Sequence, residues 1–264
     1  MITPAAKWLL DREGLAAGTP WLGLVYVVGT VPFAIALIKP DPASAGWHPD
    51  GERIPPGGVA IAPTGTPYRE ALASRFFIGI TIGYILVLGS QVGAIQQIVK
   101  LVEERTTANT AAFATLVLAA TSVVARLIGG RIATVAPMTA MTAAFALLQA
   151  VAAVFLAFAM STTMLFAAII LFGATIGNIL MLQPLLIAER FGVRDYPRIY
   201  SRGQLFTLVG TAGGPLLLGA LHDVSDGYEL PYVIAGVCSL VGVGAILWAG
   251  PANDRTATTE EAMA

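Results

Sequence analysis

The stretch FFIGITIGYILVLGSQVGAIQQIV, residues 76–99, decides the fold class because it contains no Asp, Glu, Lys or Arg. A helix needs about 20 predominantly apolar residues to cross the hydrocarbon core of a bilayer, and this stretch meets that requirement. Of the 264 residues in the chain, 56% are hydrophobic and only 12% are charged. An ordinary soluble domain carries roughly 25% charged residues. The sequence therefore predicts an all-α polytopic membrane protein.

Further stretches are apolar and long enough to span, so that we predict seven spans, the first of which is the shortest. They cover residues 21–38, 76–99, 109–130, 135–159, 163–187, 203–222 and 230–250. Pairs of glycines four residues apart recur within them, and such pairs let helix backbones approach closely. The pairs are Gly79 with Gly83, Gly89 with Gly93, Gly173 with Gly177, and Gly210 with Gly214.

Residues 39–75 separate the first two spans and differ from them in composition. The segment is rich in proline and glycine and contains a Pro-Asp-Gly turn signal at residues 49–51. This pattern is typical of a linker rather than of a folded domain. Its last part, Tyr68 to Arg75, is expected to form a helical turn at the membrane surface. The polar residues 251–264 are expected to be a short C-terminal tail.

The remaining composition excludes several classes of protein. The formal net charge is −1, and no basic run is interleaved with aromatic residues, which argues against a nucleic-acid partner. The single cysteine, Cys238, lies in an apolar run and behaves there as a small hydrophobe. No metal-ligand cluster, activated nucleophile or pair of carboxylates appears, so we expect neither an enzyme nor a cofactor. The N-terminus lacks the pattern of a signal peptide.

Lysine and arginine are unevenly distributed, and their excess marks the cytoplasmic side of a membrane protein. With residues 39–75 inside, eleven basic residues lie on the cytoplasmic side, and only Lys7, Arg12, Lys100 and Arg105 lie on the other. This predicts a multi-pass protein of the cell (inner) membrane with a cytoplasmic C-terminus. The eleven are Lys39, Arg53, Arg69, Arg75, Arg126, Arg131, Arg190, Arg194, Arg198, Arg202 and Arg255.

Four arginines gather in AERFGVRDYPRIYSRGQ, residues 188–204, between the fifth and sixth predicted spans. They are spaced by four residues, and Glu189 and Asp195 are interleaved with them. In one interpretation they are orientation anchors, and in a second they form a gating latch of charge pairs that rearranges with conformation. Arg131, in the preceding cytoplasmic loop, is a further gating candidate. The four are Arg190, Arg194, Arg198 and Arg202.

Several stretches resemble carriers of the major facilitator superfamily, of the monocarboxylate and oxalate:formate antiporter type. FGVRDYPRIYSRGQLFTLVGTAGGPLLLGALHDVSDGYELPYVIAGVCSLVG, residues 191–242, is similar to the last two spans of these carriers. VVARLIGGRIAT, residues 123–134, resembles the end of their eighth span and the loop after it. KPDPASAGWHPDGE, residues 39–52, resembles their central linker, and TPAAKWLLDREG, residues 3–14, resembles the periplasmic connection before their sixth span.

The resemblance implies the second six-helix half of such a carrier plus one preceding helix. Residues 1–38 then correspond to a remnant of the N-terminal half, 39–75 to the cytoplasmic linker, 76–250 to the six-span C-terminal half and 251–264 to a cytoplasmic tail. The implied function is secondary active transport of a small, monocarboxylate-like organic anion by alternating access. The implied partner is a complementary N-terminal six-helix half or a second copy, and single copies are not expected to transport.

Arg126 matches the arginine of the eighth span that holds the substrate carboxylate in monocarboxylate carriers. A guanidinium suits this role because it pairs two carboxylate oxygens at once and stays charged. The alternative is that Arg126 lies near the helix end and snorkels to water. Ser122 stands where monocarboxylate members carry an aspartate. Residues 203–222 contain no lysine, which argues against oxalate, because oxalate-type carriers use a lysine there.

Three amides are further candidates for substrate binding. Gln91 and Asn178 lie near mid-span, where the substrate sites of such carriers lie, and Gln204 lies at the start of the sixth span. Each is either a substrate ligand or a hydrogen-bonding partner of a neighbouring helix. No Asp or Glu lies within a predicted span. The alternative function is a non-transporting module, namely an orphan half that serves as a scaffold or sensor, or the product of an interrupted gene.

Overall fold

The computed structural model describes residues 2–37, 46–47, 53 and 64–252. The chain divides into two compact units, Met1–Pro63 and Thr64–Ala264. Most of the predicted linker and of the predicted C-terminal tail, including the Pro-Asp-Gly turn at residues 49–51, lies outside the described residues.

The first unit is dominated by one long helix, α1 (Ile2–Leu37). Gly14 has φ 75° and interrupts its helical geometry, so that α1 consists of two helices joined at a kink. Its apolar part is Gly23–Leu37, which is shorter than the predicted span at residues 21–38. Further along, Trp47 and Arg53 form an isolated β-bridge, and the Arg53 guanidinium lies 5.2 Å from the centre of the Trp47 ring.

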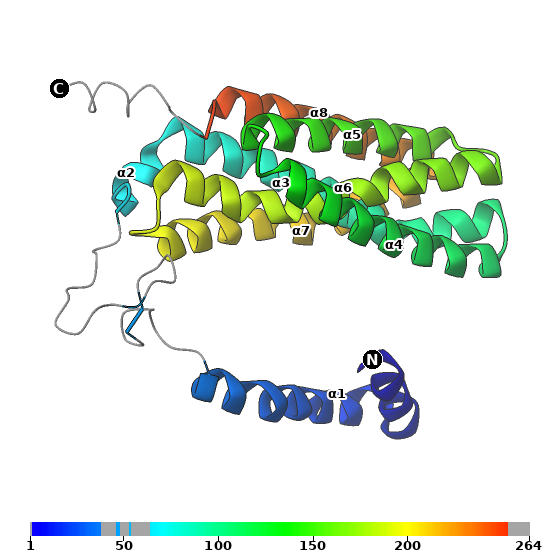
Figure 1. Ribbon diagram of the computed structural model, residues 1–264. Helices are drawn as coiled ribbons and strands as arrows, with labels where there is room; N and C mark the ends of the chain where they lie inside the picture. Colours follow the sequence, from blue (N-terminus) through cyan, green and yellow to red (C-terminus); the bar gives the residue numbers. More distant parts are fainter. Residues whose placement is uncertain (1, 38–45, 48–52, 54–63, 253–264) are drawn as a thin grey trace, which may run out of the picture. The chain divides into compact units, whose positions relative to one another are not determined.

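The second unit is a bundle of helices (Figure 1). Six of its helices are long and apolar enough to cross a membrane, which confirms an all-α, multi-pass membrane protein. Within the described residues, β-structure is limited to two isolated bridges. The helices are α2 (Tyr68–Ala73), α3 (Arg75–Arg105), α4 (Ala108–Ile132), α5 (Met138–Phe158), α6 (Thr162–Phe191), α7 (Tyr196–Ser225) and α8 (Glu229–Ala249).

Local signals explain where these helices begin. The short helix α2 confirms the predicted helical turn after residue 68. It is separated from α3 at Ser74, which has ψ 143° and accepts a hydrogen bond from the Phe77 N–H. Helix α7 begins at Tyr196, earlier than the predicted residue 203, because Pro197 is favourable in a first helical turn and the polar start of a helix can extend beyond the hydrocarbon core.

The packing of the six long helices repeats itself after three helices. α3 packs most extensively against α7 and α8, α6 packs most extensively against α4 and α5, and α5 also packs against α8. Exchanging α3 with α6, α4 with α7 and α5 with α8 converts the two contacts of α3 into the two contacts of α6 and leaves the contact between α5 and α8 as it is. The bundle therefore consists of two three-helix units, α3–α5 and α6–α8, with equivalent packing (Figure 1).

Three of the four predicted glycine pairs lie at equivalent crossings of these two units, and the fourth, Gly79 with Gly83, faces α8. A Cβ atom added to Gly89 or Gly93 of α3 would lie 3.0 or 2.8 Å from the carbonyl oxygen of Gly210 or Gly214 of α7. A Cβ atom added to Gly173 or Gly177 of α6 would lie 3.0 Å from the carbonyl oxygen of Leu118 or Ser122 of α4. At both crossings the glycines let two backbones touch, as expected for such pairs.

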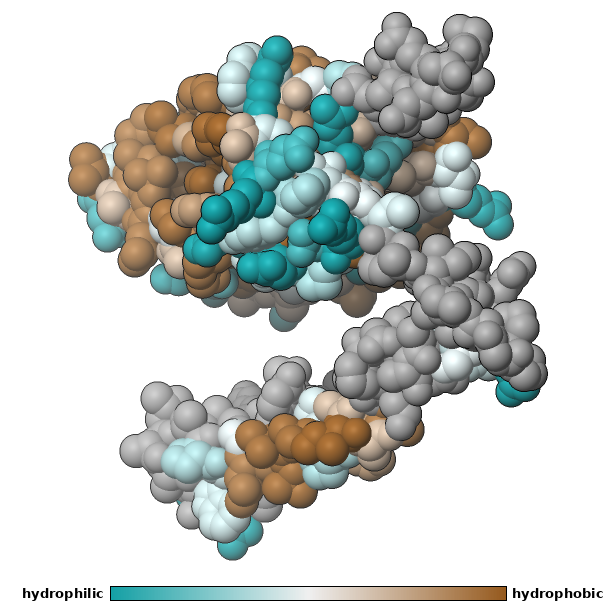
Figure 2. Space-filling model, turned by 90° about the vertical axis from the view of Figure 1, so that its left-hand side faces the viewer, coloured by the Kyte–Doolittle hydropathy of each residue, from teal (hydrophilic) through white to brown (hydrophobic). Residues whose placement is uncertain are grey.

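One end of the bundle carries α2, the start of α3 and the loop between α6 and α7; we call it the arginine end. Figure 2 looks onto this end, where hydrophilic residues gather in the centre and hydrophobic residues surround them. Its exposed arginines are Arg69, Arg75, Arg194, Arg198 and Arg202. Arg75 donates from Nε to the Trp248 carbonyl oxygen at 2.6 Å. A charged centre with apolar flanks is the pattern of a helix bundle that ends at a membrane surface.

The opposite end is closed by Arg105, at the C-terminus of α3. Its guanidinium donates three hydrogen bonds of 2.8 to 3.0 Å to the carbonyl oxygens of Leu156, Ala157 and Ala159, which end α5. The same side chain lies 3.8 Å from Glu229, at the start of α8. Arg105 thus ties three helices together and satisfies carbonyl groups that have no partner within their own helix.

Candidate functional site

The outer helices α4 and α7 expose most of their surface. Only 17% of the most apolar stretch of each is buried, against 44 to 67% in the other four long helices. Within residues 64–252, α4 and α7 share no packed interface, although each contacts α6. We call the surface formed by α4, α6 and α7 the open face. A polar residue on this face is available to a ligand or a partner.

Arg126 lies on α4 and is exposed. Its side chain crosses α6 at Gly177, where a Cβ atom added to the glycine would lie 2.7 Å from Arg126 Nε. Arg126 has no hydrogen-bond or ion-pair partner among the described residues. It precedes the last residue of α4, Ile132, by about 9 Å along the helix axis. A guanidinium at this depth is costly in a membrane unless an anion or water reaches it.

Asn178 lies beside Arg126, at the same crossing of α4 and α6. The side chain is fully buried, and its Nδ2 donates to the carbonyl oxygens of Ala125 at 3.0 Å and Ala174 at 2.9 Å. Its Oδ1 is buried without a hydrogen-bond partner and faces Gly129. Asn178 therefore joins α6 to the backbone of α4 next to Arg126, and both of its donors are already used.

Gln204 lies on α7, the third helix of the open face. It donates to the Tyr200 hydroxyl one turn earlier and lines a cavity of about 430 Å³ between α3, α6 and α7. Three hydroxyl side chains also line this cavity, together with leucines. They are Ser201, Thr207 and Thr211. The cavity therefore combines neutral donors and acceptors with apolar walls, as ligand sites usually do.

Gln183 of α6 lies next to the cavity beside Gln204, although its place in the sequence does not distinguish it from other amides. Its Nε2 donates to Thr207 Oγ1 at 3.3 Å. Its Oε1 is buried without a partner. A buried acceptor without a donor is uncommon and calls for an explanation such as a water or ligand. The only sequence feature that points to Gln183 is an amide within a predicted span, and several other positions have the same feature.

Gln91 lies apart from these residues, in the packed interior between α3, α5 and α8. It is 1% exposed, and its Nε2 donates to Gln149 Oε1 at 2.6 Å. Gln149 donates in turn to the Val87 carbonyl oxygen and to Ser239 Oγ, both at 2.9 Å. The network holds three helices together, so the structure does not bring Gln91 to the open face.

The four arginines of residues 188–204 occupy helix ends as well as a loop. Arg190 is in the last turn of α6, Arg194 lies in the short loop, and Arg198 and Arg202 lie in the first turns of α7. Of the interleaved acids, Asp195 pairs with Arg198 at 3.7 Å, whereas Glu189 lines a separate cavity of about 480 Å³ at the ends of α4 and α8. Arg131 is exposed in the last turn of α4.

Tyr68 of α2 is the residue that connects these arginines, and the charge pattern did not predict it. Its backbone N–H donates to the Asp195 carboxylate at 3.1 Å, and its hydroxyl accepts from Arg202 Nε at 3.1 Å. The Arg198 guanidinium lies 4.7 Å from the centre of its ring. The arginines of α7 are therefore held mainly by an aromatic side chain of α2.

The segment before α2 pairs with the loop between α6 and α7. Thr66 N–H donates to the Phe191 carbonyl oxygen at 2.8 Å, and the N–H groups of Val193 and Arg194 donate to the Thr64 carbonyl oxygen at 3.1 and 3.2 Å. Backbone pairing of this kind depends on conformation rather than on side chains, so the sequence carried no signal for it.

Among the described residues, no three His, Cys, Asp or Glu side chains gather as a metal site would require. No protein-family model and no curated protein matches this chain.

Proposed function

We propose that the chain is part of a secondary carrier that moves a small organic anion across the membrane by alternating access. The observation that carries the proposal is the repeated packing of α3–α5 and α6–α8. Because each unit has three spans, the second would enter the membrane from the opposite side to the first. Repeats of inverted topology are typical of secondary transporters, including the major facilitator superfamily, and this supports the resemblance of the sequence to that family.

Arg126 supports an anion as the substrate. It is an exposed cation of the open face, has no partner among the described residues and lies next to Asn178. A carboxylate would satisfy it with two parallel hydrogen bonds. The cavity of about 430 Å³ beside Gln204, between α3, α6 and α7, favours a small molecule, and the Gln204 amide and the hydroxyls there would orient it. A monocarboxylate fits these properties.

The exposure of the open face supports the proposal that a partner packs on it. Alternating access in such carriers requires one bundle to rock against another around the substrate. α4 and α7 are exposed along their lengths, and Arg126 would face lipid if nothing covered them. We therefore propose that a complementary six-helix unit or a second copy of this chain packs on the open face, in the cell membrane.

Transport by reconstituted protein tests this proposal. Liposomes containing the purified chain should take up labelled acetate or lactate saturably when each holds several copies, and should not do so at limiting dilution. Membranes that also supply a complementary unit should restore uptake. Saturable uptake by single copies would contradict the need for a partner but support transport. If no small carboxylate is taken up or exchanged under any of these conditions, the proposal that the chain is part of a carrier is wrong.

The proposed orientation has its own test. We expect the loop between α6 and α7 to face the cytoplasm, because eleven of the fifteen basic residues would then be inside. Val193 in this loop is 53% exposed. A cysteine at this position, with Cys238 replaced by alanine, should react with an impermeant thiol reagent only after the cytoplasmic side is opened. Reaction in intact cells would invert the topology, and the Cys238→Ala parent is the control.

A further inference from the structure

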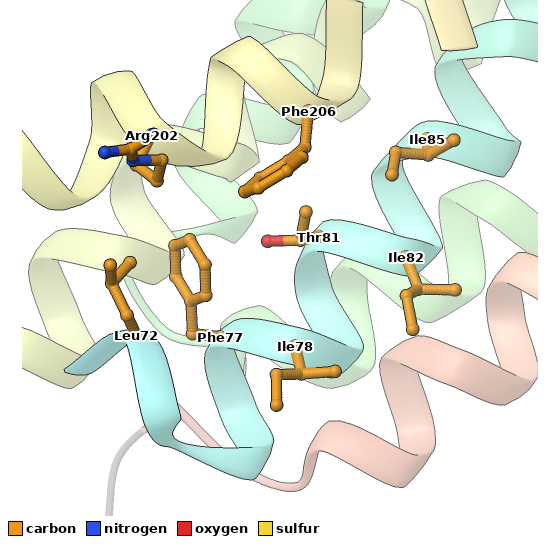
Figure 3. Close-up of a pocket in the computed structure, with 8 residues that line it drawn as sticks. All are labelled: Leu72, Phe77, Ile78, Thr81, Ile82, Ile85, Arg202 and Phe206. Carbon is orange, nitrogen blue, oxygen red and sulfur yellow. The ribbon is translucent and has the colours of Figure 1, made fainter. Parts of the chain in front are cut away.

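A second hollow, separate from the open-face site, lies between α2, α3 and α7 (Figure 3). It has a volume of about 490 Å³. Its walls are Phe77, Ile82 and Ile85 of α3 and Phe206 of α7, with Leu72 of α2 at one end. Figure 3 shows the Phe77 and Phe206 rings on opposite sides of the hollow and Arg202 at the same end as Leu72. The hollow is therefore an apolar groove with one charged end.

The groove follows the helix axis inward from the arginine end. Ile78, Ile82 and Ile85 line it on successive turns of α3, which corresponds to about 10 Å of helix. Ile78 and Ile82 are 41% and 45% exposed, so the groove is open on the outer surface of the bundle. In a membrane, this position reaches from the headgroup level into the upper part of the acyl chains.

The charged end carries two guanidinium groups. Arg202 borders the groove and also lines a neighbouring cavity of about 430 Å³ together with Arg198, Ser201 and Tyr68. Tyr68 accepts a hydrogen bond from Nε of Arg202, while its two terminal nitrogens have no partner among the described residues. The Arg198 side chain is 70% exposed and pairs loosely with Asp195 at 3.7 Å. Two guanidinium groups against one carboxylate leave an excess of positive charge.

We propose that this groove binds an anionic phospholipid, with one acyl chain against Phe77, Ile82 and Phe206 and the phosphate on Arg198 and Arg202. Guanidinium groups bind phosphate oxygens with charge-assisted hydrogen bonds, and basic pockets between membrane helices on the cytoplasmic side recognise lipid headgroups. Tyr68 holds both guanidinium groups beside the groove, so the site is preorganised. The charged end adjoins the cavity beside Gln204, because Ser201 and Leu205 line both, but the groove itself shares no residue with that cavity and the proposal requires neither Arg126 nor Gln204.

Quenching of tryptophan fluorescence by brominated lipids tests the site. Ile82 is replaced by tryptophan as the reporter, and Trp8, Trp21, Trp47 and Trp248 are replaced by phenylalanine. The protein is reconstituted into phosphatidylcholine vesicles that contain either phosphatidylglycerol or phosphatidylcholine with brominated acyl chains at equal mole fractions. We expect brominated phosphatidylglycerol to be enriched at the reporter by roughly fivefold per arginine, the equivalent of about 1 kcal/mol each, and to saturate at low mole fraction.

Charge variants identify the residues responsible. Replacing Arg198 and Arg202 together by glutamine should abolish the preference for phosphatidylglycerol, whereas Arg198→Lys with Arg202→Lys should keep most of it. Arg131→Gln is the matched control, because it removes an exposed arginine from the end of α4, away from the groove. Equal quenching by the two lipids in the reporter protein, a preference that does not saturate, or the same loss in Arg131→Gln would each overturn the proposal. The first two readings do not depend on how well the glutamine variant folds.

Discussion

Replacing Gly214 by alanine is expected to lower the melting temperature of the purified protein sharply, whereas the same change at Gly213 should leave it unchanged or raise it. A Cβ atom at Gly214 would collide with the carbonyl oxygen of Gly89, and one at Gly213 would meet nothing within 4 Å. The colliding atom belongs to the backbone of α3, so that no side chain can turn away. Forcing extra volume into such a contact costs typically about 1–3 kcal/mol.

The two glycines are neighbours on α7, so this pair of variants separates packing from helix propensity. Both changes replace glycine by alanine and gain the same helix propensity, of up to about 1 kcal/mol. Thermal unfolding in detergent, followed by circular dichroism, measures the difference between them. Gly173→Ala of α6 should lower the melting temperature less than Gly214→Ala, because a Cβ atom there would lie 3.0 Å from the Leu118 carbonyl oxygen of α4. Equal melting temperatures for the Gly213 and Gly214 variants would show that α3 and α7 are not in close contact.

The spans could be predicted from sequence because a bilayer imposes a local requirement on each helix. A run such as residues 76–99 contains all that is needed to identify α3, and the glycine spacing identifies surfaces for close packing. The partner of each glycine pair depends on the arrangement of all six helices. Nothing near Gly89 in the chain indicates that it faces Gly210 rather than another helix, so the equivalence of the two three-helix units became apparent only in three dimensions.

Part of the candidate site was also predictable, because a bilayer restricts which residues a span can contain. Arg126 is conspicuous because a charge within a span is rare, and the structure brings it beside Asn178. Gln91 fits the same sequence criterion as Asn178, yet it bonds to Gln149 inside the bundle. An amide at mid-span indicates only that a hydrogen-bond partner is needed, and either another helix or a ligand can supply it. Tyr68 escaped prediction because its partners are more than 120 residues away in the chain.

Replacing Arg126 by lysine should weaken substrate uptake by the assembled carrier. Arg126→Lys keeps the positive charge on the open face, but an ammonium group cannot match the two oxygens of a carboxylate with two parallel donors. The loss of one hydrogen bond to a charged group costs about 1.5–3 kcal/mol, which corresponds to roughly a 10- to 100-fold change in affinity. We therefore expect uptake of a labelled monocarboxylate at low concentration to fall by a factor in this range.

The matched control is Arg131→Lys, since Arg131 lies in the last turn of the same helix and is exposed. Whether its charge anchors the helix end or takes part in gating, a positive charge is all that it supplies, so lysine should serve equally well there. Membrane abundance should stay at the parental level in both variants, because the number of positive charges that orients the chain does not change. High substrate concentration should restore part of the uptake in Arg126→Lys if binding is the step that suffers. Parental uptake by Arg126→Lys at low concentration would mean that Arg126 extends to the membrane surface as an anchor, and the carboxylate would then have to be held elsewhere on the open face.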